Sequence, residues 1–301
     1  MTDVFKQFIQ SSTIGNLIDK VKPIEQQRDL IDLPATATIE EALDLLLAED
    51  IKSVPIYELD QNEKKYIMIV SALDLLRLIC SQITEDINSQ IEVKEELLLI
   101  PLKEAIHFSE HLTILKSSEL IDKLIGLFTI EHRALVDYDS KLVLLSQMDL
   151  IQYLQLENHK IGSNVLDLTV ESIKYNEIKS MISYKTTAVE AFLKLGADSR
   201  VTSLPIIDDT EEFIAELSSN DLRGLNRERL SALRKPVIMY LKESHGSLPA
   251  PMTCHFNFTL SQLLSAFILR NTNKLWCLDP NTGQLKAVIT LTDIITTLAS
   301  V

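Results

Sequence analysis

The feature that most constrains this chain is a sequence pattern that occurs four times, at intervals of about 72 to 75 residues. Each copy ends with Ser or Thr, two further residues and Asp, directly after a strand-like apolar run and before a helix-like one. These tetrads are Ser71 to Asp74, Ser146 to Asp149, Ser218 to Asp221 and Thr290 to Asp293. A single tetrad of this kind is common, but four in register indicate a fold built from one repeated unit.

The unit is clearest at residues 117–150. Apolar residues at helical spacing from Leu120 to Phe128, preceded by Ser118 as a capping residue, predict a helix of about 12 residues. Residues 134–136 and 142–145 predict two strands joined by a turn, and a second helix follows. The unit is therefore helix, strand, strand, helix, which predicts a mixed α/β (α+β) fold.

The repeats account for nearly the whole chain. We expect four modules in two tandem pairs after an N-terminal segment, with the segment at residues 1–27 and the modules at residues 28–82, 98–155, 165–229 and 236–301. The opening helix of each module is predicted to begin at a polar residue, namely Thr38, Ser118, Thr187 or Thr259. No stretch remains for a separate catalytic domain, so an enzyme is not expected.

Composition excludes several classes of function. The formal charge of −14 and the pI near 4.9 argue against nucleic acid or an anionic membrane as the main partner. No run of about 18 apolar residues and no basic-then-apolar leader is present, so we expect a soluble protein of the cytoplasm, with the nucleus as an alternative. The histidines and cysteines show no metal-ligand spacing, and we expect neither a metal nor a resident cofactor. Cys80, Cys254 and Cys277 are interpreted as packing residues.

Three segments resemble one known family: His132 to Asp137, Arg200 to Asp208 and Leu291 to Ile295. They are similar to segments of the CBS domain, and more specifically to those of the gamma subunit of AMP-activated protein kinase. The resemblance implies modules that pair and bind AMP, ADP or ATP in a cleft, with kinase catalytic and scaffold subunits as partners. Fungal four-module proteins that regulate phosphatases and stress signalling are the alternative comparison. Asn273 and Lys274 stand where this family usually has His and Arg.

The resemblance and the residue chemistry together suggest which side chains bind the nucleotide. A carboxylate in the first turn of a helix can accept hydrogen bonds from both ribose hydroxyls, and the candidates are Asp74, Asp149, Asp221 and Asp293. The alternative is that these aspartates only cap their helices. Basic residues just before a module strand are candidates for binding phosphate, with solvated surface charge as the alternative: Lys52, His132, Arg133, Arg200 and Lys274. Lys52, His132 and Asn273 each lie at the same distance from the preceding capping residue.

Two functions fit these observations. The first is a nucleotide sensor, in which a bound nucleotide shifts the geometry or rigidity of the modules and a partner kinase or phosphatase responds. The second is a scaffold whose modules have no ligand affinity, which the substitution at Asn273 favours.

Overall fold

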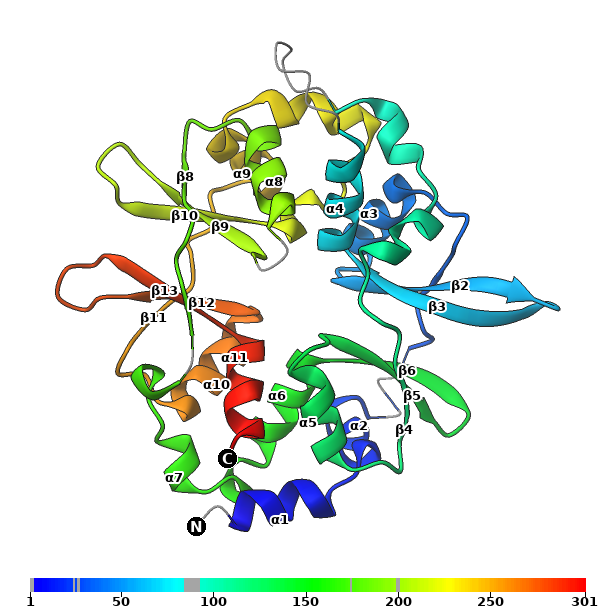
Figure 1. Cartoon of the computed structure of the whole chain (residues 1–301), viewed down its shortest axis with the longest axis vertical. Helices are drawn as coiled ribbons and strands as arrows, with labels where there is room; N and C mark the ends of the chain where they lie inside the picture. Colours follow the sequence, from blue (N-terminus) through cyan, green and yellow to red (C-terminus); the bar gives the residue numbers. More distant parts are fainter. Residues whose placement is uncertain (1–2, 24, 26–27, 84–92, 174, 199–200) are drawn as a thin grey trace. The chain divides into compact units, whose positions relative to one another are not determined.

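The computed structural model describes residues 3–23, 25, 28–83, 93–173, 175–198 and 201–301. Within them lie four modules of one plan (Figure 1). In each module a short strand precedes the opening helix, a two-stranded hairpin follows, and a closing helix ends the module. The short strand pairs parallel with the first hairpin strand, which pairs antiparallel with the second. The predicted helix, strand, strand, helix unit is confirmed, with a short leading strand added in every module.

The element bounds show how closely the modules correspond. Module 1 consists of β1 (Leu33–Pro34), α3 (Ile39–Ala48), β2 (Ser53–Asp60), β3 (Glu63–Ser71) and α4 (Ala72–Gln82). Module 2 consists of β4 (Ile114–Lys116), α5 (Ile121–Phe128), β5 (Arg133–Tyr138), β6 (Lys141–Ser146) and α6 (Gln147–Leu156). Module 3 consists of β8 (Ile182–Ser183), α8 (Ala188–Ala197), β9 (Ser203–Ile207), β10 (Phe213–Ser218) and the 3-10 helix η6 (Ser219–Leu222). Module 4 consists of β11 (Thr253–His255), α10 (Leu260–Arg270), β12 (Lys274–Leu278), β13 (Leu285–Thr290) and α11 (Leu291–Ala299).

The modules group into two compact units that do not follow the order of the chain. Unit 1 comprises Met1–Leu30, Thr113–Ile178 and Met252–Val301, and therefore holds modules 2 and 4. Unit 2 comprises Ile31–Leu112 and Lys179–Pro251, and therefore holds modules 1 and 3. Each unit segment begins later in the chain than the module boundary expected from the sequence. The reason is that the segment leading into each module packs in the other unit.

The segments that precede the modules contain four helices, called here the exchanged helices: α2 (Ile14–Val21), η3 (Leu102–His107), η5 (Val170–Ser172) and α9 (Val237–His245). Each one precedes one module in the chain but lies against the next or the previous one. Thus α2 precedes module 1 and contacts α5 and α6 of module 2, whereas η3 precedes module 2 and contacts α4 of module 1. In the second half, α9 precedes module 4 and lies against α8 of module 3, and the residue before η5 forms a bridge with the start of α10.

Reciprocal hydrogen bonds hold each exchanged helix beside the opening helix of its host module. The Ile14 amide donates to Glu119 O at 2.8 Å, and the Ile121 amide donates to Ser12 O at 2.9 Å. Equivalent pairs link Leu102 with Ala37 and Val237 with Thr186. The first amides of a helix have no partner within the helix, so each helix supplies acceptors for the other.

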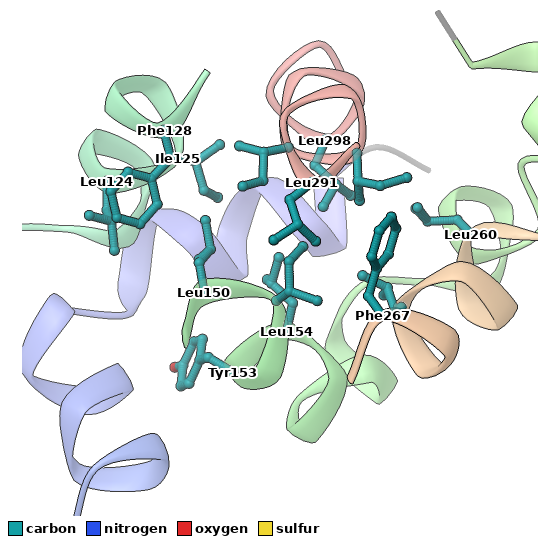
Figure 2. Packing of buried hydrophobic residues seen from close by; sticks show 14 of the residues in the cluster. Leu124, Ile125, Phe128, Leu150, Tyr153, Leu154, Leu260, Phe267, Leu291 and Leu298 are labelled. Atoms are coloured by element: carbon teal, nitrogen blue, oxygen red, sulfur yellow. The ribbon is translucent and has the colours of Figure 1, made fainter. Parts of the chain in front are cut away.

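The core of unit 1 lies between helices of modules 2 and 4. Leu124, Ile125 and Phe128 of α5 lie near Leu291 and Leu298 of α11, while Leu154 of α6 lies near Phe267 of α10 (Figure 2). The apolar faces of α1 (Asp3–Ser11) and α2 join the same core through Phe5, Phe8, Ile9, Ile14, Leu17 and Ile18. The N-terminal segment is therefore an integral part of unit 1.

Unit 2 has a core of the same kind, with one difference in module 3. Helix α4 packs against α8 and η6, and α8 packs against α9. The closing element of module 3 is only the short η6, where the sequence predicted a longer helix. Gly224 ends it with a φ of +73°, and its amide donates to Leu43 O of α3 at 2.8 Å. This φ lies in the left-handed region that favours glycine, and a Cβ at this position would lie 2.3 Å from a methyl carbon of Leu47, which would have to move.

Candidate functional site

The start of each closing helix is a capping box built around the repeat aspartate. In all four modules the Asp Oδ2 atom accepts a hydrogen bond from the amide of the capping Ser or Thr, at 2.6–2.8 Å. The hydroxyl of the same Ser or Thr donates to this oxygen at 2.6–3.1 Å. The capping role is therefore confirmed for Asp74, Asp149, Asp221 and Asp293. It engages Oδ2, so a ribose would interact chiefly with Oδ1.

In modules 2 and 3 a basic residue engages the Oδ1 atom of the repeat aspartate. Lys22 Nζ lies 3.2 Å from Asp149 Oδ1 in module 2, and His245 Nε2 lies 2.8 Å from Asp221 Oδ1 in module 3. The aspartate side chains are only 13% and 12% exposed, whereas Lys22 and His245 are 34% and 38% exposed. Neither contact could be predicted from the sequence, because both partners come from the exchanged helices.

Two of the predicted phosphate-binding residues, Arg133 and Lys274, lie directly beside the start of a closing helix. Arg133 begins β5 and pairs in register with the capping Ser146, and Lys274 begins β12 and pairs with the capping Thr290. The carbonyl of His132 accepts a hydrogen bond from the amide of Gln147, the first residue of α6, at 3.1 Å. Lys52 immediately precedes β2, and Arg200 lies outside the described residues. In modules 2 and 4 the structure therefore places a basic residue opposite the N-cap of the helix that carries a repeat aspartate.

The strand register defines which residues of the four modules are equivalent. The position of Arg133 is taken by Ser53, Ser203 and Lys274, each paired with the cap of its closing helix. The position of His132 is consequently taken by Lys52, Thr202 and Asn273. Modules 2 and 4 thus carry an Arg or Lys at the first hairpin position, whereas modules 1 and 3 carry Ser.

The starts of the two closing helices in unit 1 contact each other. Gln147 Nε2 of α6 donates to Thr292 Oγ1 of α11 at 2.9 Å and to Phe128 O at 2.8 Å. Gln147 is 5% exposed, so this link is buried. The first turns that carry Asp149 and Asp293 are consequently held close together.

The opening helices confirm three of the four predicted polar starts. Thr38, Thr187 and Thr259 are the N-caps of α3, α8 and α10, and each forms a capping box with the residue three positions later. The prediction for Ser118 is wrong, because α5 begins at Ile121 with Leu120 as its N-cap. The first amide of α5 donates to Ser12 O, as the first amides of α3, α8 and α10 donate to a carbonyl of a neighbouring segment, and the apolar Leu120 adds no capping hydroxyl. The equal spacing of Lys52, His132 and Asn273 from a cap therefore does not extend to module 2.

The remaining chemistry of the described residues is sparse. Among them, no group of three His, Cys, Asp or Glu is placed to hold a metal ion. In the same part of the chain, no helix is both long and apolar enough to cross a membrane. Burial raises the pKa of the Cys80 thiol to about 11, so this group stays protonated at neutral pH. Cys254 and Cys277 are buried on adjacent strands, in keeping with a packing role.

Comparison with known proteins agrees with this geometry. Residues 21–81 match the CBS domain family. The chain is 22% identical to the SNF1-related protein kinase regulatory subunit gamma-like PV42a of Arabidopsis thaliana, over 91% of this chain and 93% of that protein. It is 23% identical to the 5'-AMP-activated protein kinase subunit gamma of Saccharomyces cerevisiae, over 96% of this chain and 91% of that protein.

A solved structure shares the whole fold. It is that of a protein from Methanocaldococcus jannaschii, proposed to be an archaeal homolog of g-AMPK, with a TM-score of 0.65 and 15% sequence identity. The match covers 90% of this chain and 96% of that one. The fold is therefore that of four CBS modules in two tandem pairs, as the sequence predicted. Each compact unit contains one module from each tandem pair.

Proposed function

We propose that this protein binds adenine nucleotides and regulates a protein kinase. The proposal starts from its fold of four CBS modules and its similarity to gamma-type kinase subunits. The observation that carries the proposal is the pair of closing-helix starts in unit 1. Each combines a repeat aspartate with a basic residue at the first hairpin position, Arg133 in module 2 and Lys274 in module 4. The cation suits a phosphate group, and the carboxylate suits the ribose diol.

The proposed roles follow from this arrangement. Arg133 and Lys274 would contact phosphate oxygens, and His132 and Lys52 are further candidates, each in its own module. Asp293 and Asp149 would accept ribose hydroxyls through Oδ1, while Oδ2 keeps the helix capped. AMP, ADP and ATP share the ribose and the first phosphate, so all three are ligands to be tested. The protein itself would act by binding rather than by catalysis.

Nucleotide binding could reach a partner through the contact between the two helix starts. The Gln147 to Thr292 hydrogen bond links the first turns of α6 and α11, so a ligand that orders one turn also restrains the other. We propose that kinase catalytic and scaffold subunits are the partners, in the cytoplasm or the nucleus. The apolar faces of α1 and α2 are buried in unit 1, so docking would use another surface.

A second candidate function is a scaffold without ligand affinity. The contacts of Lys22 with Asp149 and of His245 with Asp221 favour it, because they engage the oxygens that a ribose would need. Calorimetric titration of the full chain with AMP, ADP and ATP separates the two functions. Heat of binding with at least one nucleotide supports the sensor, and its absence with all three supports the scaffold.

Replacing Asp293 with Asn is expected to remove most of the nucleotide-induced stabilisation while changing the apo melting temperature little. Asn keeps an acceptor oxygen for the Thr290 amide and so preserves the cap, but it lacks the charge that strengthens hydrogen bonds from ribose. The expected loss is about 1.5–3 kcal/mol of binding free energy. Thermal unfolding with and without AMP measures both effects.

Glu190→Gln is the matched control for this variant. Glu190 has the same place in the capping box of α8, an opening helix with no proposed ribose contact. Its replacement is expected to leave the AMP-induced shift unchanged. If Asp293→Asn lowers the apo melting temperature but keeps the full AMP-induced shift, Asp293 is a cap and not a ribose ligand.

A further inference from the structure

Two exchanged helices end in a basic residue that reaches a repeat aspartate of the host module. Lys22 is the C-cap of α2 and lies 3.2 Å from Asp149 Oδ1 in module 2. His245 is the last residue of α9 and lies 2.8 Å from Asp221 Oδ1 in module 3. The two helices hold equivalent positions beside their modules, since the residues that precede them form equivalent bridges, Thr13 with Leu120 and Pro236 with Thr187. The two contacts therefore form a recurring arrangement.

The chemistry of the aspartate makes these contacts competitors of a ribose. Its Oδ2 atom already accepts two hydrogen bonds within the capping box, from the amide and the hydroxyl of Ser218 in module 3. A carboxylate oxygen has about two lone-pair directions, so Oδ2 has no further capacity. A ribose that donates to Asp221 must use Oδ1, which His245 engages.

We propose that Lys22 and His245 set the nucleotide occupancy of modules 2 and 3 by holding the ribose-binding aspartate, so that a nucleotide must displace them to bind. The inference rests on the proposed function, because it assigns competitors to the same ribose contact. It implies unequal affinities, with module 3 the weaker site because it also lacks an Arg or Lys at the first hairpin position. Lys22 and His245 would thus control binding at these modules although neither residue belongs to the helix, strand, strand, helix unit.

The surroundings of His245 make the contact reversible. The pKa of His245 is raised by its hydrogen bond to Asp221, while burial and the nearby Arg223 and Arg229 lower it. Arg229 also donates to Ser244 Oγ, and Tyr240 donates to Asp221 O at 2.7 Å, so α9 is anchored even without the His245 contact. The His245 side chain is 38% exposed, which leaves it room to move away from the aspartate.

The test is calorimetric titration of the full chain with AMP. His245→Ala is expected to tighten binding at one site by about two- to fivefold, the range for a partly exposed ion pair. The same substitution in an Asp221→Asn background is expected to change nothing, since His245 acts through Asp221. Lys242→Ala, which removes an exposed cation from the same helix, is the control and should bind AMP like the wild type.

The pH dependence provides a second readout. A protonated His245 holds Asp221 most strongly, so AMP affinity should rise as pH increases from 6.5 through the raised pKa of His245. The AMP phosphate also titrates near pH 6, but it does so equally in all variants. His245→Gln keeps a neutral hydrogen-bond donor and should lack the additional rise shown by the wild type.

The outcomes separate this inference from the proposed function. If the wild type binds AMP and His245→Ala binds with the same or lower affinity, the inference is overturned while the proposed function stands. If no variant binds AMP, the inference is overturned, and if none binds ADP or ATP either, the proposed function is overturned with it. The inference is supported if His245→Ala binds AMP at an additional site or more tightly at one site, and if adding His245→Ala to Asp221→Asn has no such effect.

Discussion

Replacing Phe267 with alanine is expected to destabilise modules 2 and 4 together, by about 3–5 kcal/mol. Phe267 lies on α10 of module 4, is fully buried, and packs near Leu154 of α6 in module 2 (Figure 2). The cavity left by the ring would therefore open in a core that two modules share. Modules 2 and 4 are separated in the chain by the whole of module 3. A joint loss of their stability is therefore expected only if the two modules share the core of unit 1.

Hydrogen exchange with mass spectrometry measures this effect directly. In Phe267→Ala, the amides of α6 should lose protection together with those of α10. Leu269→Ala is the matched control, because Leu269 is on the same helix but is 82% exposed. Phe267→Leu should give the same pattern with a smaller loss of protection, and it can be measured if the alanine variant folds poorly. Loss of protection confined to module 4 would contradict the shared core.

The second large effect is expected at Arg133. Its replacement by alanine should weaken AMP binding by about 1.5–3 kcal/mol, or roughly 10- to 150-fold in Kd, the range for hydrogen bonds to charged groups. Arg133 begins β5 beside the N-cap of α6, and a guanidinium there can bind a phosphate through two hydrogen bonds. The AMP affinity of Arg133→Lys should lie between those of the wild type and Arg133→Ala, because lysine keeps the charge but cannot make the bidentate contact.

Lys141→Ala is the control for Arg133. Lys141 is an exposed cation that pairs with Tyr138 at the turn of the same hairpin, at the opposite end from Ser146. Its loss should leave AMP affinity unchanged, which excludes a general effect of net charge. If calorimetry gives equal affinity for Arg133→Ala and the wild type while the fold is intact, Arg133 is a surface charge.

The repeated unit could be predicted from the sequence because its signals are local. The capping boxes at Thr38, Thr187 and Thr259 join residues three positions apart, and each hairpin joins strands that are neighbours in the chain. The aspartates of the closing helices were located for the same reason. The prediction for Ser118 is wrong because Ser117 and Ser118 both lie shortly before α5, and only the structure shows that this helix begins at Ile121 with Leu120 as its N-cap.

The sequence by itself determined the four modules and the start of every closing helix, since both depend on residues close together in the chain. Only the tertiary structure decided that module 2 shares a core with module 4, because all four modules carry similar apolar helices and the pattern does not distinguish their partners. The same holds for the exchanged helices and the contacts of Lys22 and His245 with Asp149 and Asp221. These contacts exist because packing of apolar faces carries each helix to a module other than the one it leads into, and a basic residue at its end then reaches the aspartate.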